Sequence, residues 1–305
     1  MRNNFAEALY NEAKKDKKIC VVVADISPAG SMQKFRTEFP DRFINCGVAE
    51  QSMIGIAAGL ALKGFRPFCY TIATFTLYRP FEMVRVDLCY QNLPVTIIGM
   101  GAGAIYSTLG GTHQSIEDIS IASSIPNMKV LAPCDPLEMK EATTWCATKN
   151  DGPVYMRLGK VGEPTFTEGA ADPFEFGKPR YIIKGKDTAI ISYGISIKIA
   201  KEIYDKLKEK GQNNSLISCH TIKPLDIKAL INILNNHKKT IVIEEHVPHG
   251  GLSSRIKEIS YDNNIKKDIK CFTLKDKFMH FYGNHNELLE MHELSASKIL
   301  NKINE

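Results

Sequence analysis

The chain has 305 residues, of which 44% are hydrophobic, and a formal net charge of +5. This length suits two domains that each bury a core, and no apolar run is long enough to cross a membrane. The excess charge consists largely of lysines in the last third of the chain, which is typical of a solvated face. Aromatics among them, such as Phe272 and Phe278, are interpreted as core residues and not as a nucleic-acid surface. We therefore expect a protein that binds neither nucleic acid nor membrane.

The eight cysteines are scattered, and no two have the two-residue gap that is typical of metal or redox sites. Most lie in apolar runs, where cysteine behaves as a small hydrophobe. The N-terminus is charged and lacks the apolar core of a signal peptide. These features predict a cytoplasmic protein.

Strands and helices are predicted to alternate in the first half of the chain. The strand at 19–24 is an unbroken β-branched run that is typical of a buried parallel strand. Further strands are expected at 43–48, 67–73, 95–100, 129–131 and 154–158. Helices are expected at 50–63, 78–91 and 135–149, and a short one opens at Ser115.

The second half repeats this alternation. Strands are predicted at 188–192, 215–219, 240–244 and 270–273, and helices at about 195–210, 226–235, 252–261 and 286–301. Residues 166–179 are rich in Gly, Pro, Thr and acids, and are predicted to link a domain at 1–165 to a domain at 180–305. The predicted fold class is α/β, with two domains that each form a mostly parallel sheet with helices on both faces.

Polar and aromatic residues gather where predicted strands end. Asp25, Glu50, the segment after residue 73 and the glycine-rich loop at 99–111 each follow a strand. Because ligands of open α/β sheets sit at the carboxyl ends of strands, a carboxylate, several aromatics and His113 are expected at one edge.

Each candidate also has a simpler interpretation. Glu50 suits the first turn of a helix, where the dipole favours an acid. Phe75, Tyr78 and Phe81 could form one apolar helix face. Arg157 ends a strand, as a surface cation or as an anion clamp. Two further histidines, at 246 and 249, lie in a Pro/Gly loop that does not favour a metal site.

Taken together, these segments resemble the C-terminal part of a transketolase, over nearly the whole chain and in the expected order. The matching segments are Gly-Val-Ala-Glu-Gln at 47–51, the aromatic segment from Thr74 to Phe81 and Arg85, Gly-Thr-His-Gln at 111–114, Asp-Gly-Pro-Val-Tyr-Met-Arg at 151–157, Thr-Ile-Lys-Pro-Leu-Asp at 221–226, and residues 244–252.

The resemblance implies thiamine diphosphate as cofactor. It implies that Glu50 contacts the aminopyrimidine ring, that Phe75 stacks on it, and that Tyr78 and Phe81 complete an apolar wall. The remaining implied residues are Asp25 and Ile26 for the cofactor, and His113, Arg157, Arg2, Leu109 and Ser31 for the substrate, with His113 also assisting proton transfer.

The diphosphate-binding part of the family is missing. No Gly-Asp-Gly occurs in the chain, and no later Asn for magnesium is found. The resemblance is therefore to the C-terminal subunit of a split transketolase. It implies an N-terminal partner subunit that holds the diphosphate and Mg²⁺, in an assembly of two copies of each.

Two positions depart from the family and concern the substrate, which is expected to be a phosphorylated sugar. Leu109 stands where transketolases carry an acid that reads a sugar hydroxyl. Gly101 stands where they carry a histidine that helps hold the phosphate.

Three other functions stay open. They are the beta subunit of a 2-oxoacid dehydrogenase, an enzyme similar to deoxyxylulose-phosphate synthase, and a non-catalytic regulatory subunit. The Gly-Thr-His-Gln segment argues against the first, and the retained Glu50 and His113 argue against the last.

Overall fold

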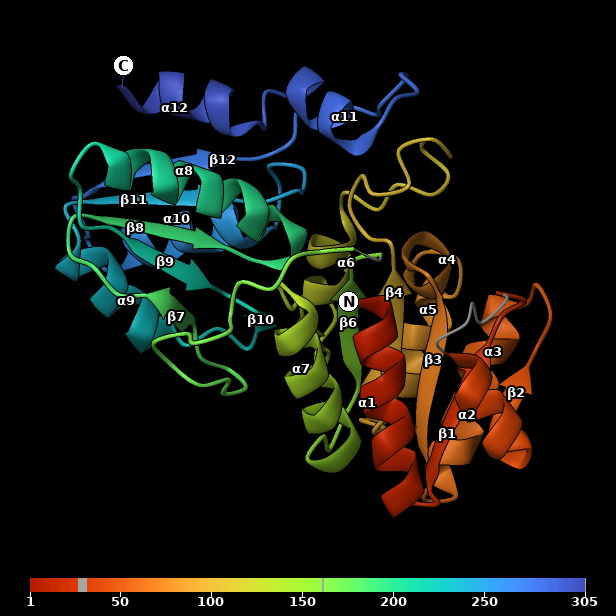
Figure 1. The fold of residues 1–305 in the computed structure, drawn as a ribbon. Helices are drawn as coiled ribbons and strands as arrows, with labels where there is room; N and C mark the ends of the chain where they lie inside the picture. Colours follow the sequence, from red (N-terminus) through yellow and green to blue (C-terminus); the bar gives the residue numbers. More distant parts are fainter. Residues whose placement is uncertain (27–31, 161, 305) are drawn as a thin grey trace.

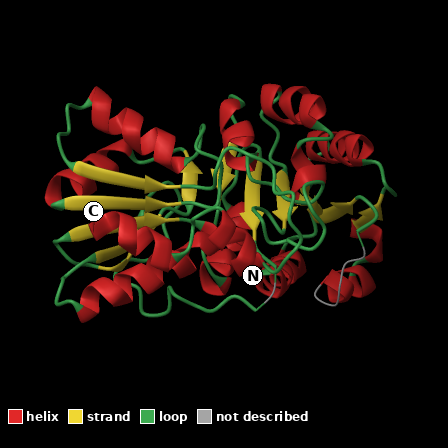
Figure 2. Ribbon diagram, turned by 90° about the horizontal axis from the view of Figure 1, so that it is seen from above, coloured by secondary structure: helices red, strands yellow, loops and turns green. Residues whose placement is uncertain are grey.

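The structure is a computed structural model that describes residues 1–26, 32–160 and 162–304. Two sheets lie side by side, and helices cover both faces of each (Figures 1 and 2). The predicted α/β class with two mostly parallel sheets is confirmed. None of the described helices is long and apolar enough to cross a membrane.

The first sheet has seven strands in the order β10-β5-β6-β4-β3-β1-β2, and its pairs are parallel except β10 with β5. Every residue of β1, β4 and β6 is buried, as expected for central strands covered on both faces. The strands are β1 (Ile19–Val23), β2 (Phe43–Asn45), β3 (Arg66–Ile72), β4 (Thr96–Met100), β5 (Lys129–Leu131), β6 (Val154–Leu158) and β10 (Thr221–Lys223).

The register of this sheet aligns the strand ends that carry the candidate site. Val23 of β1 pairs with Asn45 of β2, and Ile72 of β3 pairs with Met100 of β4. The helices around the sheet are α1 (Arg2–Lys15), α2 (Gln33–Glu38), α3 (Glu50–Leu62), α4 (Ala73–Leu77), α5 (Phe81–Met83), α6 (Asp118–Ser124) and α7 (Pro136–Thr148), with a 3-10 turn η2 (Pro40–Arg42) and a π-helix η3 (Val84–Tyr90).

The second sheet has five strands in the order β12-β11-β8-β9-β7, parallel except β7 with β9. Its strands are β7 (Arg180–Ile183), β8 (Thr188–Ser192), β9 (Ser215–Ser218), β11 (Lys239–Ile243) and β12 (Asp268–Phe272). Its helices are α8 (Ile197–Glu209), α9 (Ile227–Asn236), α10 (Leu252–Asp262), α11 (His285–Met291) and α12 (Ala296–Asn304), with a 3-10 turn η4 (Gly194–Ser196).

The helix predicted at 78–91 starts later than expected. It begins at Phe81, directly after Pro80, as α5, and it continues as the π-helix η3 to Tyr90. Proline has no N–H to donate and its ring clashes with the preceding turn, so the chain does not run as one regular helix from α4 through Pro80 into α5. The single helix predicted at 286–301 is wrong. It is two helices, α11 and α12, separated at Glu293, which has a φ of 59°.

Three shorter predictions also need correction. The strand expected at 43–48 ends at Asn45, whose side chain accepts hydrogen bonds from the backbone N–H groups of Asp25 and Gly47. The helix expected from Ser115 begins at Asp118, because Ser115 forms a bridge with Gly103 instead. Helix α1, which was not predicted, covers one face of the first sheet with Phe5 and Leu9.

Strand β10 belongs to the first sheet although it lies late in the sequence. Thr221 pairs with Leu131, and β10 runs antiparallel to β5 (Figure 1).

The segment at 166–179, predicted to be a linker, contains no helix or strand and is packed onto its neighbours. Phe176 stacks on Trp145 at 3.8 Å between ring centroids, and Phe174 stacks on His220 at 4.4 Å. These contacts tie the two sheets together.

Candidate functional site

Glu50 lies at the carboxyl edge of the first sheet, as the first residue of α3. Its side chain is 2% exposed. A buried carboxylate is costly unless it is paired and hydrogen-bonded. Its partner is Arg79, whose Nη1 lies 2.8 Å from Oε2 and 3.0 Å from Oε1.

The same arginine lies over an aromatic ring. The guanidinium of Arg79 is 4.6 Å from the ring centroid of Phe75, within the range of a cation–π contact. Phe75 and Arg79 are four residues apart, one helical turn, which places both on one face of the chain around α4. A flat cation is therefore held between a buried acid and an aromatic face.

His113 completes this group from the glycine-rich loop. Its ring packs edge-on against Phe75 at 5.1 Å and against Tyr106 at 6.1 Å. Thr112 Oγ1 lies 2.9 Å from its Nδ1. Burial lowers the pKa of His113, so the neutral imidazole dominates near pH 7. A neutral imidazole can accept a proton at one ring nitrogen and donate a hydrogen bond from the other.

The loop conformation explains the glycine at position 101. Gly101 has a φ of +68°, which glycine adopts without strain. A Cβ at this position would overlap the ring of Tyr106. Tyr106 therefore fills the space beside Gly101. The family resemblance leads one to expect a histidine at position 101.

An open hollow of about 580 Å³ lies beside this group. It is lined by Thr74, Phe75, Tyr78, Arg79, Gly111, Thr112, Gln114, Glu117 and Phe278. Burial raises the pKa values of Tyr78 and Glu117, and Asp118 adds to both shifts. Phe278 comes from the second half of the chain and is 65% exposed, so both halves of the chain contribute to the hollow.

Other predicted cofactor residues do not line this hollow. Asp25 is exposed at the end of β1 with a φ of 47°, and Ile26 packs on the core of the first sheet. Phe81 packs against the hydrophobic core and does not line the hollow. Ser31 lies outside the described residues.

The predicted substrate residues separate into two groups. Leu109 is 48% exposed on the glycine-rich loop. Arg2 lies close enough to Tyr106 to oppose the rise in the pKa of that phenol, which burial causes. Arg2 is therefore near Tyr106, whose ring packs against His113.

Arg157 is placed elsewhere. It is 6% exposed, and its Nε lies 3.2 Å from Asp118 Oδ2. It also donates to the backbone oxygens of Ser115 and Glu245, at 3.3 and 2.9 Å. Its guanidinium thus joins the two halves of the chain, and it does not line the hollow. An anion-binding role for Arg157 stays a prediction.

Sequence reasoning missed Arg79 and Tyr106. The spacing of Phe75 and Arg79 by one helical turn could have indicated the first. An aromatic within a glycine-rich loop could have indicated the second. Among the described residues, no group of three or more His, Cys, Asp or Glu could hold a metal ion.

An acid, an aromatic ring and a histidine thus meet at the carboxyl edge of a mostly parallel sheet, which is where α/β proteins bind ligands. Residues 1–162 match the pyrimidine binding domain of transketolase, and residues 177–299 match the transketolase C-terminal domain. The chain belongs to the transketolase family.

The relatives include both split and full-length enzymes. The chain is 32% identical to an apulose-4-phosphate transketolase subunit of Phocaeicola vulgatus, over 98% of this chain and 94% of the relative. It is 33% identical to 1-deoxy-D-xylulose-5-phosphate synthase of Clostridium acetobutylicum, over 98% of this chain but 48% of that enzyme. A solved structure described as a split gene transketolase in an inactive beta4 tetramer matches with a TM-score of 0.87 and 31% identity, covering 99% of this chain and 96% of that one.

Proposed function

We propose that this chain is the C-terminal subunit of a split transketolase, which transfers a two-carbon ketol unit from a ketose to an aldose with thiamine diphosphate as cofactor. The observation that carries the proposal is the contact of Glu50 and Phe75 with one flat cation, directly beside His113. Relatives that are named as transketolase subunits and match nearly end to end support it.

The site fits the pyrimidine half of the cofactor. A guanidinium is flat, cationic and rich in N–H donors, as a protonated aminopyrimidine is. It is held here between an acid and an aromatic face. Glu50 would bind the ring nitrogen, and Phe75 would stack on the ring in the place that Arg79 now occupies.

The cofactor, when bound, supplies the chemistry that breaks and forms the carbon–carbon bond. The protein would orient and tune the reacting groups. Glu50 would share a proton with the ring nitrogen, in a buried position where such a hydrogen bond is strong. His113 would bond the substrate oxygens and move a proton to or from them. Phe75 and Tyr78 would exclude water from the ring.

The substrate is proposed to be a phosphorylated sugar. Arg2 lies near the loop of His113 and could meet an anionic group. Relatives with a whole-length match are named for apulose-4-phosphate, which is a phosphate ester. Leu109 cannot accept a hydrogen bond from a sugar hydroxyl. The site should therefore discriminate weakly between sugars that differ at the carbon that carries this hydroxyl.

The partner is proposed to be an N-terminal transketolase subunit that binds the diphosphate and Mg²⁺, in an assembly of two copies of each chain. Helix α3 offers a surface for such an assembly. Ile56 and Leu62 are 38% and 63% exposed, and no atom lies within 4 Å of a Cβ built on Gly55 or Gly59. We infer that α3 packs against another subunit.

Eight free cysteines, six of them buried, support a cytoplasmic location.

Reconstitution tests the function. This chain alone should bind thiamine diphosphate weakly and transfer no ketol unit, and addition of the N-terminal subunit should restore both.

In the reconstituted enzyme, Glu50→Gln should keep the fold and lower turnover at least ~100-fold, because the isostere removes only the acid. Turnover near wild type with saturating cofactor would refute the role of Glu50. Pyruvate acting as donor in place of a ketose would instead indicate a deoxyxylulose-phosphate-synthase-like reaction.

Position 109 gives a separate test of the substrate. Leu109→Asp introduces an acceptor at an exposed loop position, so the fold should be unaffected. Activity on unmodified ketose phosphates should rise relative to the best donor. The ratio of kcat/KM values for two donors measures this, with Thr108→Asp, the exposed neighbour, as control. An unchanged donor ranking would contradict the idea.

A further inference from the structure

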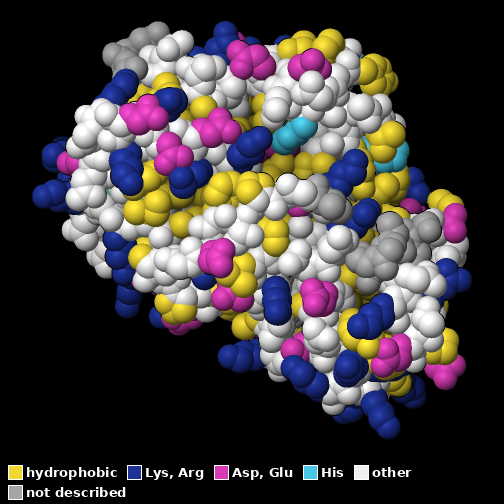
Figure 3. All heavy atoms as spheres, in the orientation of Figure 1, with side chains coloured by type: hydrophobic (Ala, Val, Ile, Leu, Met, Phe, Trp, Pro, Cys, Tyr) yellow, Lys and Arg dark blue, Asp and Glu magenta, His cyan; other side chains and the backbone are white. Residues whose placement is uncertain are grey.

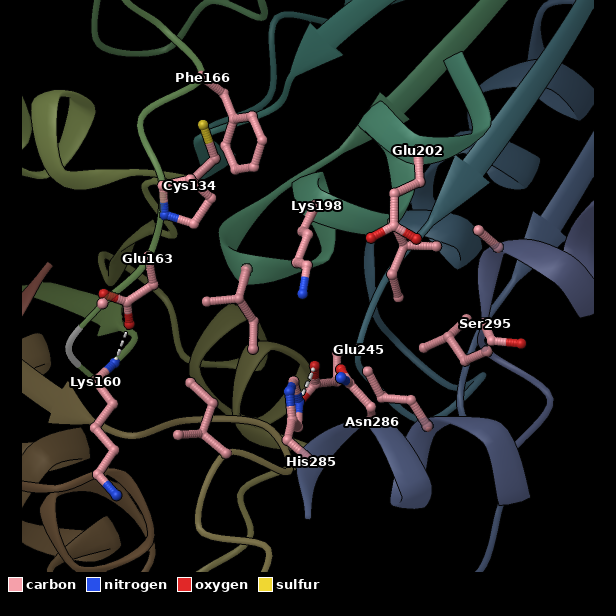
Figure 4. A pocket seen from close by; sticks show the side chains of 18 of the residues that line it. Cys134, Lys160, Glu163, Phe166, Lys198, Glu202, Glu245, His285, Asn286 and Ser295 are labelled. Carbon is pink, nitrogen blue, oxygen red and sulfur yellow. Dashed lines mark hydrogen bonds and ion pairs between the residues drawn. The ribbon is translucent and has the colours of Figure 1, made fainter. Parts of the chain in front are cut away.

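A second cavity, of about 410 Å³, lies between the two halves of the chain and away from the hollow beside His113. It is bounded by α8, α11 and residues 162–166, and Figure 4 shows the side chains that line it. In the surface view, a hollow with a hydrophobic floor opens near α8 and α11, with a histidine at its rim (Figure 3). A volume of this size suits a small-molecule site.

The cavity lies at the topological switch point of the second sheet. After β8 the chain moves to β9 on one side, and it later returns to β11 on the other side of β8. In open parallel sheets, ligands bind outside the carboxyl ends of the two strands where this reversal occurs. Ile195 follows β8 and Glu245 follows β11, and both line the cavity.

Most of the charged groups in the cavity already have partners. Glu245 is 1% exposed and lies 2.9 Å from His285 Nε2, and it also accepts a hydrogen bond from the backbone N–H of Ala104. Glu163 is paired with the N-terminal amine of Met1 at 2.7 Å. Lys160 turns away, with its Nζ 5.4 Å from the ring of Tyr106 (Figure 4).

Lys198 is different. It extends from α8 toward the His285–Glu245 pair (Figure 4), and its charge opposes protonation of His285, so the two cations are neighbours. Lys198 is exposed to solvent at the edge of the cavity, and within the part of the chain that the structure describes it makes no ion pair. An ammonium group beside an imidazole, over a floor of Ile195, Ile199 and Leu289, calls for an anion attached to an apolar body.

The remaining charges limit the anion. Glu202 and Glu290 also line the cavity, and Glu290 has only a long contact of 3.7 Å to Lys298. These carboxylates would repel a polyanion such as a nucleotide or a sugar diphosphate. They repel a single negative charge less strongly, and the ammonium group of Lys198 offsets that repulsion.

We propose that this cavity is a second ligand site, which binds a small carboxylic acid with an apolar body between Lys198 and the isoleucine and leucine side chains. The site does not depend on the proposed function of the first. It does adjoin the active-site loop, because Glu245 holds both His285 and the N–H of Ala104. A bound carboxylate would therefore contact residues that anchor the loop of His113.

The test uses the full chain and two matched probes, 4-methylpentanoate and its uncharged amide, with binding measured by ligand-observed NMR and calorimetry. The carboxylate should bind with a Kd of about 1 mM, and the amide at least ~10-fold more weakly. Lys198→Met should remove this difference between the probes. Lys208→Met, an exposed lysine on the same helix that does not line the cavity, should leave it unchanged.

Two results would overturn the proposal. One is no binding of the carboxylate at about 10 mM, a concentration well above the expected Kd. The other is equal binding of the carboxylate by wild type and Lys198→Met. Loss of binding in His113→Ala, with Lys198 intact, would assign the probe to the first site and would also contradict the proposal.

Discussion

At the residue scale, the contact between Arg79 and Glu50 bears on the proposed binding of thiamine diphosphate. Arg79 is held by the same two groups, the Glu50 carboxylate and the Phe75 ring, that the aminopyrimidine would need. Arginine at 42% exposure can swing out into solvent, whereas Glu50 at 2% exposure cannot move away. Under the proposed function, cofactor binding would therefore require Arg79 to leave.

We predict that Arg79→Met increases the affinity of the reconstituted enzyme for thiamine diphosphate. The gain should be at most about tenfold, because a half-exposed ion pair contributes little. Calorimetry of the assembled enzyme measures it, and Arg85→Met is the control in the same segment. Weaker cofactor binding by Arg79→Met would show that the arginine is itself a cofactor ligand.

The sequence predicts the place of those candidate-site residues whose position depends only on the course of the backbone. Glu50 and Phe75 both follow strands, and His113 lies on a loop that follows one, so topology alone brings them to one edge. Residues whose role depends on side-chain direction were not predictable. Arg157 also lies at the carboxyl end of a strand, but its side chain turns inward to Asp118. Nothing in the spacing of the sequence distinguishes an inward arginine from an outward one.

At the element scale, β-branched and small-residue runs identify most strands and helices, because burial on two faces leaves few alternatives. The failures have local causes. Pro80 directly precedes the helix predicted from Tyr78, which therefore begins only at Phe81. Strand β10 has three residues and pairs across 90 positions of sequence, and so short a strand has no periodicity of its own.

Helix α3 combines good burial on one side with an apolar surface on the other. Gly59 lies on the open side, where an added Cβ would meet no atom within 4 Å. Replacement of a mid-helix glycine by leucine raises helix propensity by up to ~1 kcal/mol. In a subunit interface, the same side chain would separate two backbones that approach closely.

We therefore predict that Gly59→Leu leaves the isolated chain as stable as wild type, or slightly more stable, and prevents assembly with the partner. Thermal unfolding of the single chain and light scattering of the mixture measure the two effects. The control is Lys210→Leu, at an exposed position just after α8. A control at another glycine, such as Gly177→Leu, is unsuitable because Gly177 has a φ of 90°. Normal assembly by Gly59→Leu would remove α3 from the interface.

At the scale of the whole molecule, buried hydrogen bonds join the two halves. Arg157 donates to the backbone of Glu245, and the Glu245 side chain reaches Ala104 and His285. One residue of the second half thus contacts both β6 and the loop of His113. Phe278, which lines the hollow beside Phe75, comes from the same half. The geometry of the candidate site therefore depends on how the second half docks.

The His285–Glu245 pair makes this docking sensitive to pH. Burial raises the pKa of Glu245, but His285, Arg157 and the Ala104 N–H outweigh it, so the net shift is downward. Burial and Lys198 lower the pKa of His285, but Glu245 outweighs them, so the net shift is upward. A raised histidine pKa contributes stability below the unfolded value of about 6.5, and that contribution is lost as the pH rises through the folded pKa.

We predict that His285→Asn lowers the thermal midpoint of the chain by a larger amount at about pH 6 than at about pH 9, because only the protonated imidazole pairs with Glu245. Hydrogen exchange at the Ala104 amide, which donates to Glu245, should speed up in the same variant. His249→Asn is the matched control, since that histidine is 77% exposed and its contact with Asp276 lies at the surface. An equal loss at both pH values would mean that His285 acts through packing and not through its charge.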